Sequence, residues 1–333
     1  MSERYSLLKP FNIIEAEKYT VQLLNFFAPL NANKIRAELN EPVIDKSITP
    51  LSVNQFFRYS KEVLGDNLVE RNNQNILQLI TRLEKSNFLT YAGTTGNFSL
   101  GREKCYYFTR ELTLAQIKNS LWLGECLGLE YVEYKSRPFV VAITGKSNGD
   151  EGIGTGTLIN EDTILTCAHV INDMTVDPVV KINGKNITII ETKTHDKVDV
   201  GFIKIAESIN LDSQLAFSEA FILDEVLTMG YPPIPLTKDA YIISQKGEVN
   251  SIIENYQGQR NFIYSSITRP GNSGGPVLSR RGYIVGISAR HLGRESEREK
   301  DIIPFYEGIS TTEVLKALKE LDPNIQFLYE DFN

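Results

Sequence analysis

Residues 269–277 have the types and spacing of a turn that could carry a nucleophile: Arg-Pro-Gly-Asn-Ser-Gly-Gly-Pro-Val. Glycines on both sides of Ser273 let the backbone turn sharply and expose the hydroxyl. Gly271 can adopt a positive φ, which directs its N–H into the same space as the N–H of Ser273. Two converging N–H groups can form an oxyanion hole. A Gly-Ser linker is the alternative, but Pro276 and Val277 lead directly into a predicted strand, so we expect a structured turn.

Two other positions could activate that hydroxyl. His169 follows a predicted strand in the sequence Leu-Thr-Cys-Ala-His-Val, which places its imidazole at a strand end. Asp199 opens the apolar strand 200–205, where a surface cap of the strand is the alternative interpretation. Asp196 is a second candidate for the acid, although it lies in a polar loop. Only three histidines occur in the chain: His169, His195 and His291.

A serine, a histidine and a carboxylate together can perform nucleophilic catalysis. A serine hydroxyl is a weak nucleophile near neutral pH, so it needs an adjacent base. An imidazole with an unperturbed pKa of about 6.5 can take the hydroxyl proton and return it to the leaving amine. A buried carboxylate fixes the tautomer of the ring and stabilises its protonated form.

The motifs Thr-Cys-Ala-His, Asp-Val-Gly-Phe-Ile-Lys and Gly-Asn-Ser-Gly-Gly-Pro-Val, in this order, resemble those of chymotrypsin-fold (trypsin-like) serine peptidases. The last motif is most similar to the bacterial branch with HtrA proteases and glutamyl endopeptidases. The resemblance covers about residues 137–320. It implies two six-stranded antiparallel β-barrels with the site between them. It also implies that Ser273 is the nucleophile, His169 the general base and then acid, and Asp199 the orienting carboxylate, with the N–H groups of Gly271 and Ser273 as oxyanion donors.

The sequence departs from the digestive members of this family in several ways. Asn272 replaces the Asp that pairs in those enzymes with a newly cut N-terminus, and the chain has no Ile-Val-Gly-Gly start. We therefore expect control by a route other than propeptide cleavage. Cys167 has no evident disulfide partner, whereas the Cys of this motif is bonded in vertebrate enzymes. Twelve residues follow Leu321, too few for the PDZ domain that HtrA proteins usually add, so we expect that module to be absent.

The resemblance also suggests residues for the pocket that binds the substrate side chain before the cleaved bond. Ile267 takes the pocket-floor position and does not support a preference for Lys or Arg. Thr268 resembles the Thr with which glutamyl endopeptidases recognise a carboxylate, while Ser288 replaces their His. His291 lies nearby and could substitute for that His, or be an ordinary surface residue. The charged segment 293–301 is expected to border the pocket, as a solvated loop or a mobile gate.

Strands must position these residues within the predicted second domain, residues 135–333. Short β-branched runs separated by turns predict a sandwich or barrel there. The expected strands cover residues 139–143, 155–159, 163–166, 179–182, 187–190 and 200–205. The glycine-rich run 152–156 does not lead into a helix, so we interpret it as a barrel strand and not as a dinucleotide loop. Apolar residues at helical spacing predict a final helix over 311–321.

Residues 1–134 have helical periodicity and form the predicted first domain, which is mainly α. Helices are expected over residues 14–27, 31–39, 51–64, 76–85 and 112–127. The helix 76–85 is followed by a strand, a turn-rich stretch and a second strand at 105–108. This order resembles that of a winged helix over about 40 residues, and a helix packed on a hairpin is an equal alternative.

Charge distribution bears on the partners of the first domain. Residues 1–134 contain 15 basic and 15 acidic residues, so the net charge of −7 lies entirely in the rest of the chain. A winged helix that grips DNA should show a basic stripe, and here Glu84 lies within the would-be reading helix. We expect a regulatory protein partner or intramolecular regulation through this domain, and we do not expect nucleic acid.

Composition and cysteine usage limit the remaining possibilities. With 41% hydrophobic and 23% charged residues, the chain has ordinary globular composition. Three distant cysteines, Cys105, Cys126 and Cys167, indicate neither a disulfide framework nor a zinc site. No signal peptide or apolar stretch of 18 residues is visible. We expect a cytoplasmic serine endopeptidase with protein substrates, no cofactor or metal and no membrane contact; the alternative is a DNA-binding regulator or scaffold with a vestigial peptidase domain.

Overall fold

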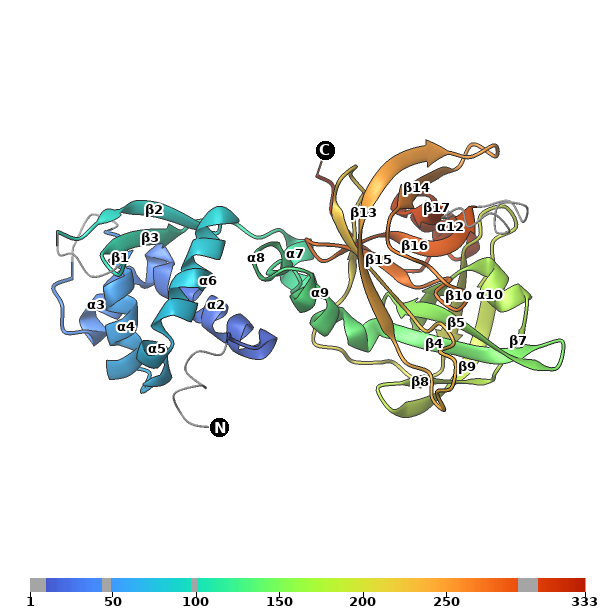
Figure 1. The fold of residues 1–333 in the computed structure, drawn as a ribbon, viewed down its shortest axis with the longest axis horizontal. Helices are drawn as coiled ribbons and strands as arrows, with labels where there is room; N and C mark the ends of the chain where they lie inside the picture. Colours follow the sequence, from blue (N-terminus) through green and yellow to red (C-terminus); the bar gives the residue numbers. More distant parts are fainter. Residues whose placement is uncertain (1–9, 44–48, 97–100, 293–304, 333) are drawn as a thin grey trace. The chain divides into compact units, whose positions relative to one another are not determined.

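The chain forms two compact units, which the computed structural model describes over residues 10–43, 49–96, 101–292 and 305–332 (Figure 1). Of residues 290–292 it describes the backbone. The first unit comprises residues 1–112 and 125–127, and the second comprises residues 113–124 and 128–333. The main boundary therefore lies near residue 112, whereas the sequence analysis places it at residue 134.

The difference in the boundary has a physical cause in helix α7 (Leu114–Asn119), which packs within the second unit. The buried side chain of Asn119 donates from Nδ2 to the carbonyl of Gly282 at 3.0 Å. Its Oδ1 accepts from the N–H of Leu121 at 2.8 Å. The predicted helix over 112–127 is also wrong, because Ser120 adopts a left-handed φ of 59° that ends α7. A separate helix, α8, spans Gly124–Leu127.

The first unit is mainly helical, as predicted. Its helices are α2 (Ile13–Phe27), α3 (Ala32–Glu38), α4 (Val53–Glu62), α5 (Leu68–Arg71) and α6 (Asn73–Lys85), with the 3-10 turn η1 (Pro29–Asn31). Its antiparallel sheet has the order β1-β3-β2, from β1 (Leu51–Ser52), β2 (Leu89–Thr94) and β3 (Lys104–Phe108). Side chains of Asn12 and Ser52 begin α2 and α4 with capping boxes. The winged-helix assignment stays a prediction.

The first sheet of the second unit has the order β7-β4-β5-β6-β10-β9-β8, and its neighbours pair antiparallel. Its strands are β4 (Val140–Ser147), β5 (Asp150–Leu158), β6 (Thr163–Thr166), β7 (Thr175–Val176), β8 (Val179–Ile182), β9 (Lys185–Thr194) and β10 (Gly201–Ile205). The resemblance implies six strands, and the structure has seven because the two-residue β7 adds to the edge at Gly145 and Lys146.

The second sheet has the order β15-β12-β13-β14-β17-β16-β11-β18. Its strands are β11 (Ala216–Phe217), β12 (Glu225–Gly230), β13 (Ile243–Glu254), β14 (Arg260–Tyr264), β15 (Pro276–Ser279), β16 (Tyr283–Leu292), β17 (Phe305–Ser310) and β18 (Leu328–Tyr329). An additional pairing of β15 with β16 closes six of these strands into an antiparallel barrel. Phe262, Val277 and Val285 belong to the core of this barrel.

Helices complete the second unit. They are α7, α9 (Leu129–Ser136), α10 (Ala168–Asn172) and α12 (Thr311–Leu321), with the 3-10 turn η2 (Arg137–Phe139). The last helix has the predicted bounds, and Val314, Ala317 and Leu318 form its buried side. Within the described ranges, no helix combines the length and the apolar character that crossing a membrane requires.

Replacing Asn119 tests whether α7 is an integral part of the second unit. Asn119→Ala leaves the buried Gly282 carbonyl and Leu121 N–H without partners, so we expect the free energy of unfolding to fall by about 1–3 kcal/mol. Urea unfolding followed by circular dichroism measures this. Ile117→Ala, at an exposed position of the same helix, should change stability by less than about 0.5 kcal/mol. Equal losses in the two variants would contradict this account of α7.

Candidate active site

The turn before Ser273 is built for a sharp change of direction. The N–H of Asn272 donates to the carbonyl of Arg269 at 3.0 Å and closes a four-residue turn with Pro270 in second place. Gly271, in third place, has a φ of 95°, as type II turns require. A Cβ at Gly271 would lie 2.7 Å from the carbonyl oxygen of Tyr231, so only glycine fits there without strain.

The backbone N–H groups of residues 271–275 fall into two sets. Three of them donate to carbonyls of the fold: Asn272 to Arg269 at 3.0 Å, Gly274 to Ser288 at 2.8 Å and Gly275 to Asn272 at 2.9 Å. The other two belong to Gly271 and Ser273, and no residue in the described parts of the chain accepts a hydrogen bond from either. They are the same two groups that the sequence predicts as oxyanion donors.

His169 and Asp199 make a two-point contact. His169 is the second residue of α10, and its backbone N–H donates to Oδ1 of Asp199 at 2.9 Å. Its ring Nδ1 lies 2.7 Å from Oδ2 of the same carboxylate. Because a carboxylate only accepts, Nδ1 carries the hydrogen and Nε2 is the nitrogen that can take up a proton in the neutral ring. The two side chains are 37% and 35% exposed, so neither is fully buried.

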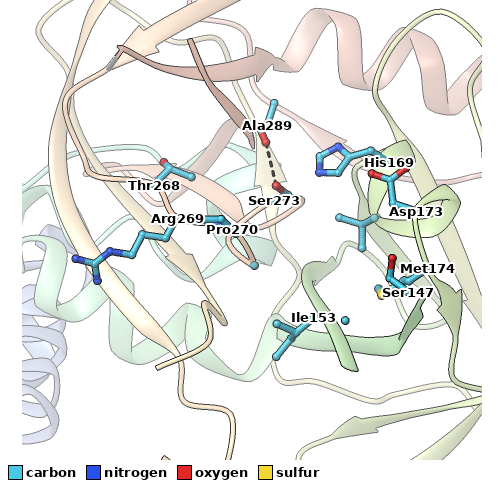
Figure 2. A pocket seen from close by; sticks show the side chains of 13 residues that line it. Ser147, Ile153, His169, Asp173, Met174, Thr268, Arg269, Pro270, Ser273 and Ala289 are labelled. Atoms are coloured by element: carbon cyan, nitrogen blue, oxygen red, sulfur yellow. Dashed lines mark hydrogen bonds between the residues drawn. The ribbon is translucent and has the colours of Figure 1, made fainter. Parts of the chain in front are cut away.

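One cavity of about 350 Å³ brings the predicted residues together. His169, Gly271, Ser273, Thr268 and Ala289 are among the residues that line it. In Figure 2 the imidazole of His169 and the side chain of Ser273 face this cavity. The Ser273 hydroxyl donates to the carbonyl of Ala289 at 2.9 Å. It must therefore rotate away from Ala289 before it can give its proton to His169.

Cys167 precedes His169 by two residues and is fully buried. Its Sγ donates to the carbonyl of Ser288 at 3.4 Å. Burial, and next the charge of Asp199, raises the pKa of the thiol well above its ordinary value. Ligand atoms of Cys167, His169 and Asp199 lie within 4.8 Å of one another, a set that could in principle hold a metal ion. Metal binding requires the thiolate, which this environment disfavours, so the donor set fits acid–base chemistry better.

The predicted specificity residues do not all reach the cavity. Thr268 lines it, and its hydroxyl shares a hydrogen bond with the Tyr264 hydroxyl at 2.7 Å. Ser288 is buried outside the cavity lining and shares a hydrogen bond with the same Tyr264 hydroxyl at 2.9 Å. Ile267 is 48% exposed and is not among the residues that line this cavity, so its place at the floor of the specificity pocket stays a prediction. The side chain of His291 and the segment 293–301 lie outside the described residues.

Tyr264 is the residue of this site that sequence reasoning missed. It is buried at the end of β14, and burial raises its pKa to about 12. Its hydroxyl joins those of Thr268 and Ser288 into one network beneath the cavity. No strand is predicted from the sequence at residues 260–264, so no local signal distinguishes Tyr264 from other core tyrosines.

The other two candidates from the loop before Asp199 lie elsewhere. His195 and Asp196 line a different cavity. Nδ1 of His195 accepts from the N–H groups of Lys197 and Val198 at 3.2 Å and 3.0 Å. Its Nε2 lies 2.9 Å from Oε2 of Glu320 on α12. His195 thus organises the turn that presents Asp199.

Asn272 occupies the interior beside the nucleophile. It is 4% exposed, and its Oδ1 has no hydrogen-bond partner among the described residues. A neutral amide can be buried in such a place at far smaller cost than an unpaired carboxylate. The position therefore suits the uncharged residue that the sequence has there.

Because the cysteines are buried, we expect their thiols to react slowly in the folded protein. Burial raises the pKa of the Cys167 thiol, and also that of Cys105, so the reactive thiolate is scarce at pH 8. We expect the folded protein to react slowly with Ellman's reagent, and all three free cysteines to react after denaturation. Cys167→Ser should reduce the denatured count to two. Fast reaction of one thiol in the native protein that is lost in Cys167→Ser would contradict the buried, protonated state.

Comparison with known proteins supports the same fold. Residues 154–287 match the family described as trypsin-like peptidase domain. Serine endoprotease DegS of Haemophilus influenzae is 31% identical over 158 residues, which cover 46% of this chain and 46% of DegS. Magnetosome formation protease MamE of Magnetospirillum gryphiswaldense is 29% identical over 145 residues, covering 41% of this chain and 19% of MamE. The chain thus spans less than half the length of these curated relatives.

A solved structure with a related arrangement is the Rv3671c protease of M. tuberculosis in its active form. It is 19% identical, has a TM-score of 0.48, and the match covers 57% of this chain and 84% of that chain. The family match and the motif-bearing barrels carry the assignment without it. The second unit of this chain thus resembles a trypsin-like peptidase domain of the chymotrypsin fold and is similar to serine peptidases of the HtrA type.

Proposed function

We propose that this chain is a serine endopeptidase that cleaves peptide bonds in proteins through Ser273, His169 and Asp199. One observation carries the proposal: His169, whose Nδ1 lies 2.7 Å from Asp199, lines one cavity together with Ser273 and Gly271, and the N–H of Gly271 has no acceptor among the described residues. A relative named serine endoprotease DegS supports the same class of reaction.

Acylation would begin when the Ser273 hydroxyl turns from Ala289 toward His169. Oγ forms a bond to the carbonyl carbon of the substrate while its proton passes to Nε2 of His169. The electron pair of the C=O bond moves onto oxygen, where the N–H groups of Gly271 and Ser273 stabilise it. Loss of one such donor typically costs about 2.7–4 kcal/mol of barrier. The C–N bond then breaks, and the leaving amine takes the proton from Nε2.

Deacylation repeats these steps with water. A water molecule gives one proton to Nε2 of His169 as its oxygen attacks the acyl carbon, and the Ser273 oxygen leaves with that proton. Asp199 keeps Nδ1–H in place and stabilises the imidazolium in both halves of the reaction. No cofactor is needed for this sequence of bond changes.

Residues 1–112 are proposed to control or target the peptidase through protein contacts. They form a compact unit of their own, which suits a separable regulatory role. Asn272 has no charge with which a cut N-terminus could pair, so control by propeptide cleavage lacks its usual acceptor. We also propose a reducing, cytoplasmic location, because Cys105, Cys126 and Cys167 are buried thiols that form no disulfide within the described ranges.

Nucleic-acid binding by the first unit is a second candidate that one observation favours. Glu84, which counts against DNA in the sequence, is turned inward and accepts from the hydroxyl of Tyr106 at 2.9 Å. The exposed positions of α6 are instead polar or basic: Gln74, Gln78, Thr81, Arg82 and Lys85. Arginine and amide side chains can read base edges in the major groove.

A fluorophosphonate probe tests the proposed chemistry, because it reacts only with an activated serine. We expect labelling of the full chain that is lost in Ser273→Ala and His169→Ala. In Asp199→Asn the labelling rate should fall by up to about 10⁴-fold, since the histidine loses its tautomer.

Ser208→Ala, at an exposed position outside the cavity, serves as the matched serine control and should label like the wild type. Labelling that persists in Ser273→Ala would assign the nucleophile elsewhere. Failure of the wild type to label, with and without added protein partners, would favour a vestigial peptidase.

A mobility shift at about 0.15 M salt decides between the two candidates for the first unit, since phosphate contacts weaken steeply with salt. We expect no shift of a duplex DNA fragment by the full chain, because basic and acidic residues balance in residues 1–134. A shift that Arg82→Ala and Lys85→Ala together abolish would assign this unit to DNA.

A further inference from the structure

Thr155 on β5 is a fully buried residue of the first sheet that contacts the nucleophile turn. Its side-chain Oγ1 donates to the carbonyl of Gly271 at 2.6 Å and accepts from the N–H of Tyr231 at 2.9 Å. Its backbone N–H donates to the carbonyl of Ser273 at 3.0 Å. Its backbone carbonyl accepts from Oγ1 of Thr166 at 2.7 Å. Thr155 thus binds the carbonyl on each side of Asn272: that of Gly271 through its side chain and that of Ser273 through its backbone.

These contacts fix two peptide groups of the turn. The peptide between Gly271 and Asn272 is held at its carbonyl by the Thr155 hydroxyl and at its N–H by the Arg269 carbonyl. The peptide between Ser273 and Gly274 is held at its carbonyl by the N–H of Thr155 and at its N–H by another strand. The peptide between Asn272 and Ser273 lies between these two fixed peptides, so its N–H, which is the N–H of Ser273, is held in direction. The carbonyl of Gly271 is fixed directly by the Thr155 hydroxyl, one residue after the second predicted donor, the N–H of Gly271.

We propose that Thr155 is a positioning residue of the oxyanion hole. The inference rests on the proposed function and extends it, because both predicted donors belong to the second barrel while Thr155 belongs to the first sheet. The residue touches no substrate; it acts by holding the carbonyl of Gly271. Preorganised donors of this kind need no reorientation when charge develops on the substrate oxygen.

The hydroxyl is the part of Thr155 that the proposal requires. Valine has nearly the same shape but can neither donate to Gly271 nor accept from Tyr231. Serine keeps both hydrogen bonds and loses only a methyl group. Thr157 is a matched control, because it lies two residues further on the same strand face, is equally buried, and has a hydroxyl with no partner in the described ranges.

The experiment measures fluorophosphonate labelling of the full chain in four forms: wild type, Thr155→Val, Thr155→Ser and Thr157→Val. The dependence of the rate on probe concentration separates the maximal labelling rate from probe affinity. We expect Thr155→Val to lower the maximal rate by about 10–100-fold with affinity within about twofold, since loss of an oxyanion donor itself costs 10²–10³. The maximal labelling rates of Thr155→Ser and Thr157→Val should stay within about threefold of the wild-type rate, because neither substitution removes a hydrogen bond to the turn.

Thermal unfolding of each form shows whether the effect is merely structural. If folded Thr155→Val is labelled at the wild-type rate, the positioning role is overturned and the proposed function still stands. Losses of equal size in Thr155→Val and Thr157→Val would overturn it too, because only one of them has a hydroxyl bonded to the turn. Absence of labelling in the wild type would overturn both proposals. If Thr155→Val does not fold, Thr155→Ala against Thr155→Ser gives the same comparison.

Discussion

The positive φ of Gly271 is the constraint on which the site depends. It lets the chain reverse direction directly before Ser273 while the surrounding N–H groups find carbonyl partners within the fold. The N–H groups of Gly271 and Ser273 are left without an acceptor among the described residues. Any residue with a Cβ at this position would collide with the backbone at Tyr231, so the turn before Ser273 requires glycine at position 271.

Residues from both barrels meet at the site, and each barrel constrains the other. In the first sheet, strand β6 precedes His169 and strand β10 follows Asp199. The turn with Ser273 leads into β15 of the second barrel. Thr155 links the two, because its strand bonds to the nucleophile turn at two carbonyls. Residues far apart in the sequence are therefore joined by one backbone hydrogen bond and one hydrogen bond from a short side chain.

Much of the site could be predicted from local sequence. The glycines around Ser273, the strand before His169 and the strand after Asp199 each determine their own geometry within a few residues. The helix α12 was predictable for the same reason, because its apolar spacing is regular. The break at Ser120, the exposure of Ile267 and the buried network of Tyr264 depend on what packs against them, and neighbouring residues do not encode that. For this reason the sequence predicts a boundary at residue 134, whereas the two compact units divide near residue 112.

His195 connects the turn before Asp199 with the last helix, α12. Its ring accepts from the turn that presents Asp199 and reaches Glu320 near the end of α12. A chain of hydrogen bonds therefore runs from Glu320 on α12 through His195 to the turn before Asp199. A substitution at Glu320 is thus expected to disturb the carboxylate that the proposed function pairs with His169.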